Sequence, residues 1–173
     1  MSVQMSFVFV KSTGHVMAVL TQTAGAELQA ADVATPSLLV RGLLDGSNFV
    51  DAAFKLTADL LDVFTGDVVE PALMAPRTYT VDKEKKKVSG IGLSVASVTA
   101  LSQKITVALP SPAGGPTNIF LACLTADPDK PEIVQSQLSG TGTSFDFSVG
   151  PLPSKARVLV LVAGYLPKLG QVP

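Results

Sequence analysis

The feature that most constrains the fold is a series of short segments in which every second side chain is apolar. Residues 104–110 (KITVALP) and 144–150 (SFDFSVG) show this spacing most clearly, and residues 118–125, 132–138 and 157–165 are also strand-like. Alternate side chains of a β-strand point to opposite faces, so a period of two indicates strands with one buried face. Turns rich in glycine and proline separate the segments, which is typical of a β-sandwich or barrel. The chain lacks the strand–helix alternation that predicts a doubly wound sheet.

The N-terminal part of the chain is also strand-like. Residues 5–10 and 15–23 predict a hairpin, and residues 23–36 predict a loop of small residues with one helical turn. Residues 37–44 (SLLVRGLL) predict a further strand, which the turn pair Asp45-Gly46 ends.

Residues 48–67 are ambiguous, because they fit one helical face and in part also a strand. Thr57 is a good N-cap and Gly66 a helix stop, which favours a strand followed by a short helix over residues 58–64. The predicted fold class is therefore all-β, an antiparallel β-sandwich with at most one short helix, near residues 57–65.

Residues 144–165 (SFDFSVGPLPSKARVLVLVAGY) resemble the E-strand, corner and F-strand of fibronectin type III and immunoglobulin-like domains. Leu152 and Pro153 occupy the corner position, whereas the corner tyrosine of those families would fall near Arg157 and is missing. The resemblance implies a fold class and no function. It suggests an N-terminal β-rich region with one short helix over residues 1–85 and an immunoglobulin-like sandwich over residues 86–173, or one continuous domain.

The alternating segments predict which side chains meet in the core. The inner faces of a sandwich interdigitate, so the apolar sides of residues 104–110, 144–150 and 157–165 should share one core. Its expected members are Ile105, Val107, Leu109, Phe145, Phe147, Val158, Val160 and Val162.

The strand at residues 157–165 needs one more neighbour in such a sandwich. The tail that follows is a poor strand candidate, since Pro167 and Pro173 cannot donate to a ladder and Gly170 weakens any strand between them. We therefore expect the N-terminal strand, residues 6–10 (SFVFV), to fill this edge, either within the same chain or from a neighbouring subunit.

Nucleophilic catalysis of the Ser-His-Asp kind would depend on His15, the only histidine. It follows Gly14 at a turn and opens a strand, so a surface or edge-strand histidine is expected. The motif GLSVA (92–96) approximates a nucleophile elbow, but Ala96 replaces the final glycine. The order is also reversed, because His15 precedes Ser94 whereas the serine comes first in α/β-hydrolases. No catalytic residue is predicted.

Metal and phosphate sites are not predicted either. One cysteine and one histidine are too few for a structural zinc site. Asp127, Asp129 and Glu132 in the stretch ADPDKPE are oxygen ligands that calcium could use, but the glycine and spacing of a calcium loop are absent, so an exposed turn is favoured. The stretch GTGTS (140–144) lacks the lysine of a P-loop. No metal and no cofactor is expected.

Cys123 lies between apolar neighbours, which predicts a buried and inert thiol in a reducing compartment. The charged run at residues 82–87 (DKEKKK) separates two short strands, and no aromatic residue stands within it. It therefore predicts a solvated hairpin tip and no nucleic-acid partner.

Composition points to a protein partner. Apolar residues make up 47% of the chain, and charged residues only 16%, against about 25% in ordinary soluble domains. Residues 1–70 carry eight acidic and three basic side chains, whereas residues 71–173 carry six and ten. Low charge and surplus apolar side chains favour association over the alternative of a monomer with an efficient core and few surface charges. The uneven charge is either a chance distribution or one that helps subunits meet head to tail.

Two functions follow as hypotheses. The first is a non-enzymatic structural or adaptor subunit of a larger assembly, of the shell, sheath or phage-tail-like kind, with itself or other subunits as partners. The second is a small-ligand-binding protein or carboxylate-dependent enzyme with a loop-lined cleft. No apolar run approaches the roughly 18 residues of a membrane span, and the start of the chain does not resemble a secretion signal. The expected location is the cytoplasm, or a particle assembled there.

Overall fold

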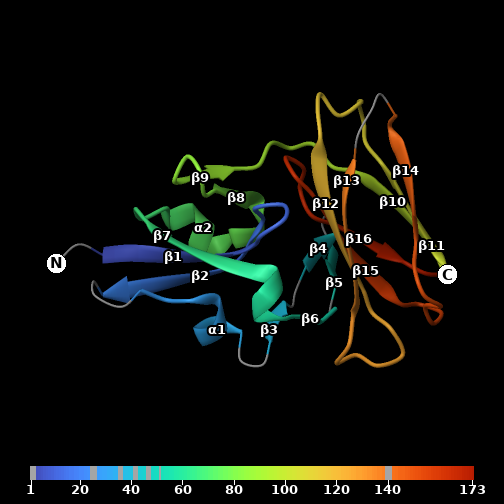
Figure 1. The fold of residues 1–173 in the computed structure, drawn as a ribbon, viewed down its shortest axis with the longest axis horizontal. Helices are drawn as coiled ribbons and strands as arrows, with labels where there is room; N and C mark the ends of the chain where they lie inside the picture. The colour runs from blue at the N-terminus through green and yellow to red at the C-terminus, as the bar shows by residue number, and fades with distance from the viewer. Residues whose placement is uncertain are drawn as a thin grey trace. The chain divides into compact units, whose positions relative to one another are not determined.

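The computed structural model describes residues 3–23, 27–34, 37–40, 43–45, 48–50, 52–138 and 142–173 (Figure 1). In the part of the chain that the structure describes, 50% of the residues are in strands and 10% in helices, which confirms the predicted all-β class. The chain divides into two compact units. The N-terminal unit comprises Met1–Leu38 and Leu56–Gly92, and the C-terminal unit comprises Leu39–Lys55 and Leu93–Pro173.

The N-terminal unit is built on an antiparallel sheet with the strand order β2-β1-β7. The strands are β1 (Val3–Val10), β2 (Val16–Thr23) and β7 (Leu61–Gly66). The first two form the predicted hairpin. After β7 follow α2 (Glu70–Met74), the 3-10 turn η2 (Pro76–Thr78) and a second hairpin, β8 (Tyr79–Asp82) with β9 (Lys87–Gly90). The core members are Met5, Phe7, Phe9, Val16, Ala72 and Val81.

The helix predicted over residues 58–64 was wrong. The segment forms one 3-10 turn, η1 (Ala58–Leu60), and then enters β7. Thr57 makes no side-chain capping bond. The six residues of β7 pair with β1, from Val10↔Leu61 to Met5↔Gly66. A helix this short is marginal in itself, so pairing with a distant strand decides the conformation. The two short helices are α1 (Ala30–Val33), in the loop where one helical turn was expected, and α2, which was not predicted.

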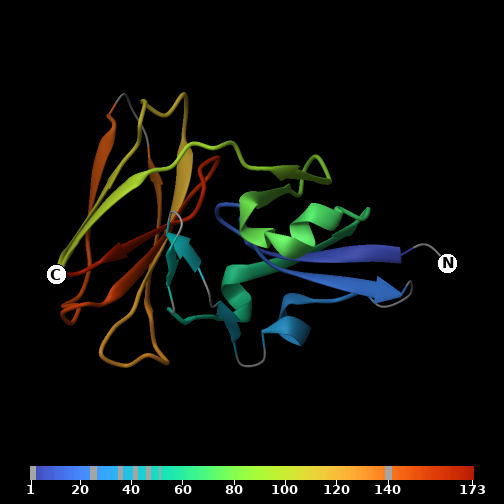
Figure 2. The same ribbon diagram turned by 180° about the vertical axis from the view of Figure 1, so that it is seen from behind.

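The C-terminal unit contains two antiparallel sheets around one core (Figures 1 and 2). One sheet has the order β10-β11-β14, and its strands are β10 (Ser97–Leu101), β11 (Lys104–Ala108) and β14 (Ser144–Ser148). The other has the order β13-β12-β15-β16, and its strands are β12 (Thr117–Cys123), β13 (Glu132–Leu138), β15 (Arg157–Val162) and β16 (Lys168–Gln171).

The predicted core is confirmed. Six of the eight expected residues belong to the buried cluster between the two sheets, and the other two, Phe145 and Phe147, are half-buried and pack against it. The side chains that point the other way from β12 and β15 are buried as well, namely Phe120, Ala122, Leu159 and Leu161. Burial on both faces explains why the sequence reads as nearly continuous apolar runs here (IFLAC and VLVLV).

The prediction that the N-terminal strand fills the edge of β15 was wrong. The C-terminal tail does so, because β16 pairs with β15 from Arg157↔Gln171 to Val160↔Lys168. The two prolines flank β16 rather than interrupt it. Gly170 suits the site, because a Cβ there would lie 2.7 Å from Val98 Cγ1 of β10. The N-terminal strand β1 lies between β2 and β7 in its own unit.

A segment from the N-terminal half of the sequence belongs to the C-terminal unit. It contains β4 (Leu43–Asp45) paired with β5 (Asn48–Val50), and β4 lies against β16. In place of the single strand predicted over residues 37–44, the structure has two short strands, β3 (Leu38–Val40) and β4. Of these, β3 pairs with β6 (Phe54–Leu56). Gly46 of the predicted turn lies outside the described residues.

Candidate interaction surfaces

The outer edge of β13 is the most distinctive exposed feature of the C-terminal unit. The strand pairs with β12 along its full length, from Cys123↔Glu132 to Thr117↔Leu138, and within the described part of the chain no strand pairs with its other side. Residues 133–138 (IVQSQL) contain no charge, proline or glycine. Lysines, prolines and bulges are the usual means by which edge strands avoid pairing. The outer edge of β13 is therefore open to another strand.

Glu132, the one charged residue of β13, is already engaged. Its two carboxylate oxygens both accept hydrogen bonds from the backbone N–H of Gly150, at 2.9 and 2.8 Å. Gln137 donates from Nε2 to Oδ1 of Asn118 on the neighbouring strand, at 3.2 Å. These bonds hold the two ends of β13, while Gln135 and Ser136 between them are exposed.

The other strands at the sheet ends of this unit differ from β13. The last residues of β16 lie against β10, as the close approach of Gly170 to Val98 shows. The strand β14 carries Asp146 at its centre, which forms an ion pair with Lys104 Nζ at 2.7 Å and accepts a hydrogen bond from Thr106 Oγ1 at 2.7 Å. A charge in the middle of an edge strand discourages pairing.

A second surface lies on α2 in the N-terminal unit. Ala72 packs in the core, whereas Met74 is 89% exposed, Leu73 43% and Val68, two residues before the helix, 42%. The three exposed side chains, called the α2 patch below, are neighbours along the chain. In the C-terminal unit Leu93, 92% exposed, precedes the first strand of the sandwich core. Apolar side chains exposed in a continuous patch mark protein-binding surfaces more often than isolated ones do, and the three residues of the α2 patch lie close together in the sequence.

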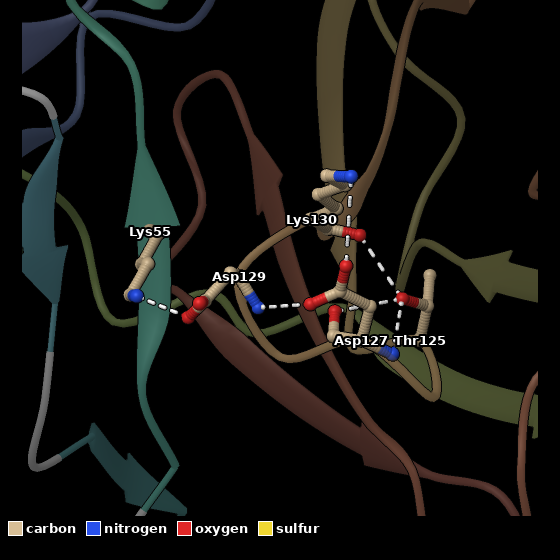
Figure 3. Close-up of polar contacts among 5 residues, drawn as sticks. All are labelled: Lys55, Thr125, Asp127, Asp129 and Lys130. Carbon is tan, nitrogen blue, oxygen red and sulfur yellow. Dashed lines mark hydrogen bonds and ion pairs between the residues drawn. The ribbon is translucent and has the colours of Figure 1, made fainter.

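The acidic stretch at residues 125–130 forms the predicted exposed turn, between β12 and β13 (Figure 3). The backbone N–H of Asp129 donates to Asp127 Oδ1 at 3.0 Å, and the Thr125 hydroxyl lies 2.9 and 3.0 Å from the carbonyl oxygens of Asp127 and Lys130. Asp129 forms an ion pair with Lys55 of β6 (Figure 3). The carboxylates thus stabilise the turn and the segment beside it. The described residues contain no group of three or more His, Cys, Asp or Glu side chains suited to a metal ion.

Of the two alternatives for His15, a surface or an edge-strand histidine, the surface position was wrong, whereas β2, which directly follows His15, does lie at the edge of its sheet. His15 is fully buried, its Nδ1 lies 3.0 Å from Thr13 Oγ1, and its backbone forms an isolated antiparallel bridge with Thr80. The cause is β8, which crosses the end of the first hairpin, where Val81 N donates to Gly14 O at 2.9 Å. Gly14 has a φ of +75°, and a Cβ there would meet Thr80 Oγ1 at 2.7 Å. No sequence signal near His15 indicates this crossing.

The remaining candidates lie in separate places. Ser94 precedes the strand β10 rather than a helix, so the strand-to-helix context of a nucleophile elbow is missing. Cys123 is buried as predicted, and burial, with a smaller contribution from the charge of Glu132, raises the pKa of its thiol to about 12. Of the stretch GTGTS, residues 140 and 141 lie outside the described residues.

The charged run at residues 82–87 forms the predicted hairpin tip between β8 and β9. Lys85 Nζ lies 2.9 Å from Asp82 Oδ2, and Lys83 Nζ lies 2.5 Å from Asp62 Oδ2 on β7. Two of the lysines are thus paired with carboxylates of the same unit rather than arranged as a basic patch.

Comparison with known proteins gives no relative from which a role could be transferred. No protein-family model, no curated protein and no solved structure matches the chain. Among the helices of the described residues, none has the length and apolar character needed to cross a membrane.

Proposed function

We propose that this protein is a non-enzymatic structural or adaptor subunit of a larger protein assembly, of the shell, sheath or phage-tail-like kind. The observation that carries the proposal is the α2 patch, where Val68, Leu73 and Met74 are exposed beside a helix whose other side packs in the core. Exposed apolar side chains in one place favour contact with another protein. The low content of charged residues, 16%, supports the same role.

The scaffold that we propose for such a subunit is an immunoglobulin-like domain formed by the C-terminal unit. Named A, B, C, C′, E, F and G in chain order, its strands β10 to β16 form the sheets A-B-E and C′-C-F-G, and two antiparallel sheets of this kind support the proposed fibronectin type III-like scaffold. The turn from E to F contains the buried Leu152, whose N–H donates to Ser102 O at 2.7 Å. Arg157 stands where the corner tyrosine would fall. Domains of this kind serve many functions, so the topology supports the scaffold and not a particular partner.

The test compares the wild-type chain with a variant of the patch. Leu73→Ser with Met74→Ser removes the apolar surface at two exposed positions, which should leave folding intact. The control is Leu93→Ser, an equally polar change at an exposed site in the other unit. We expect sedimentation velocity of the purified wild type, alone or with proteins copurified from its source, to show assemblies that become smaller in the patch variant and keep their size in the control. A wild type that sediments as a 17.9 kDa monomer in both settings would overturn the proposal.

A further inference from the structure

We propose that β13 is a self-association edge: a second copy of this chain pairs with it, antiparallel, in a register centred on Gln135. The contact joins two four-stranded sheets into one continuous sheet. It involves a different unit from the α2 patch and goes beyond the proposed function, because it names the partner and the atoms that meet.

The backbone of β13 permits this pairing. The strand has seven residues, all of them paired with β12 on one side, and its other side is unpaired within the described residues. Strand addition at such an edge draws its affinity from backbone hydrogen bonds. Seven residues match the length of β12, the longest strand in this sheet. The edge is therefore long enough to form a ladder equal to those within the unit.

The side chains favour a second copy of the same strand over other occupants. Antiparallel pairing about Gln135 places Val134 opposite Ser136, Ile133 opposite Gln137 and Glu132 opposite Leu138. No two like charges face each other, because Glu132 is the only charge on the strand. The same operation on β14 would place Asp146 opposite its own copy. Like charges directly opposite are destabilising, so β13 is self-complementary and β14 is not.

The two faces of the strand fix the register further. Val134 and Leu138 contact the core between the sheets, whereas Ile133, Gln135 and Gln137 alternate with them on the opposite side. The two cores are continuous only in registers that place core-facing residues of one copy opposite core-facing residues of the other. Among these, centring on Gln135 pairs all seven residues, and any other register leaves at least two unpaired at one end.

Disulfide trapping tests the register directly. Cys123 is buried, so a cysteine added to β13 is the reactive thiol. In Gln135→Cys, the two copies oppose each other with Cα atoms about 4.5 or 5.5 Å apart, within disulfide range. Gln137 lies on the same strand and face and is also exposed, but in Gln137→Cys the two copies lie about four residues apart along the ladder, roughly 14 Å, which is too far for a disulfide. We expect dimers from the first variant under mild oxidation and monomers from the second.

Charge exchange tests the same contact without a covalent bond. Gln135→Lys and Gln135→Glu each place a charge opposite its own copy, so the dimer dissociation constant Kd of each variant should be raised roughly twofold to fivefold. In an equimolar mixture of the two variants opposite charges face each other, and the Kd should return to the wild-type value or fall below it. Sedimentation equilibrium measures these constants, and circular dichroism checks that each variant is folded.

Several outcomes would overturn the inference. These are equal trapping of both cysteine variants, trapping of Gln137→Cys alone, or an unchanged Kd in both charge variants. Absence of any dimer would also do so and would leave an unrelated strand as the occupant. The Leu73→Ser, Met74→Ser variant should still form the Gln135→Cys dimer, so failure of the α2 patch and failure of the β13 contact give different results.

Discussion

Gly170 provides the sharpest test of the packing between the two sheets of the C-terminal unit. A Cβ at this position would lie 2.7 Å from Val98 Cγ1 and 3.5 Å from Ala100 Cβ. Contact at 2.7 Å cannot be accommodated without movement, and valine has few alternative rotamers on a strand. Gly170→Ala should therefore force a shift of β10 or β16.

The magnitude follows from two opposing contributions. Overpacking typically costs about 1–3 kcal/mol, and replacing glycine by alanine in an extended strand recovers about 0.5–1 kcal/mol of chain entropy. We expect Gly170→Ala to lower the free energy of unfolding by about 1–2 kcal/mol. For a chain of this size that corresponds to a fall of the melting temperature of roughly 2–8 °C.

The assay is a double-mutant cycle with Val98→Ala, measured by urea unfolding followed by circular dichroism. Removing the two methyl groups of the half-buried Val98 costs about 1 kcal/mol alone, but it makes room for the new Cβ. The double variant should be more stable than the sum of the two losses predicts, by about 1 kcal/mol or more. Gly114→Ala is the control, because a Cβ there meets nothing within 4 Å, and it should change stability by less than about 0.5 kcal/mol. Losses that add within about 0.3 kcal/mol would refute the close approach of β16 to β10.

Three further predictions concern single side chains. Because burial raises the pKa of Cys123 to about 12, the fraction of its thiol that is ionised at pH 8 is on the order of 10⁻⁴. Iodoacetamide should therefore label Cys123 only as the protein unfolds. Rapid labelling of the folded chain would contradict its burial. Burial disfavours the ionised form of Asp62, but its hydrogen bonds with Lys83 and Val63 outweigh this effect and lower its pKa. The ionised Asp62 carboxylate should therefore stabilise the fold above the pKa that it has in the unfolded chain, and this contribution should be lost as the pH falls through its pKa in the folded protein. Lys83→Met should raise the Asp62 pKa in an NMR titration. An unchanged pKa would exclude the ion pair. His15→Ala should cost about 1–3 kcal/mol in urea unfolding, because it leaves Thr13 without this partner and opens a cavity, and assembly measured on the still folded protein should be unchanged.

The spacing of apolar residues and the turns between them predicted the strands whose conformation depends on nearby residues alone. Residues 132–138 form a strand with the expected bounds, and the predicted strands over residues 104–110 and 144–150 contain β11 and β14. In the last two, apolar side chains recur at a period of two beside turns, and this local pattern is enough to specify a strand. The core residues were predictable for the same reason, since strand phase alone decides which side chains face inward.

The errors arise where a distant segment decides the outcome. Residues 61–66 carry a weak helical pattern, but β1, about fifty residues earlier, offers a full ladder. Gly170 suggested a broken strand, although the glycine is what allows β16 to approach β10. The candidate interaction edge was missed in the same way. The sequence predicts that β13 is a strand, but whether a strand lies at the end of a sheet depends on strand order, which no local pattern encodes.

The order of the strands also explains why the open edge lies at β13 rather than at β15. Once β16 occupies the free side of β15, the four-stranded sheet ends at β16 and β13. The end at β16 is covered, since β4 and β10 both lie against it. In the three-stranded sheet, β10 shares that contact and β14 carries Asp146 with its ion pair to Lys104. Each of these ends is thus covered or charged, which keeps another strand from pairing with it. Of the four strands at the ends of these two sheets, β13 has, among the described residues, neither a covering strand nor a charge at its centre, since its one charged residue, Glu132, stands at its first position. An edge left open where the others are blocked is the one that a partner strand can use.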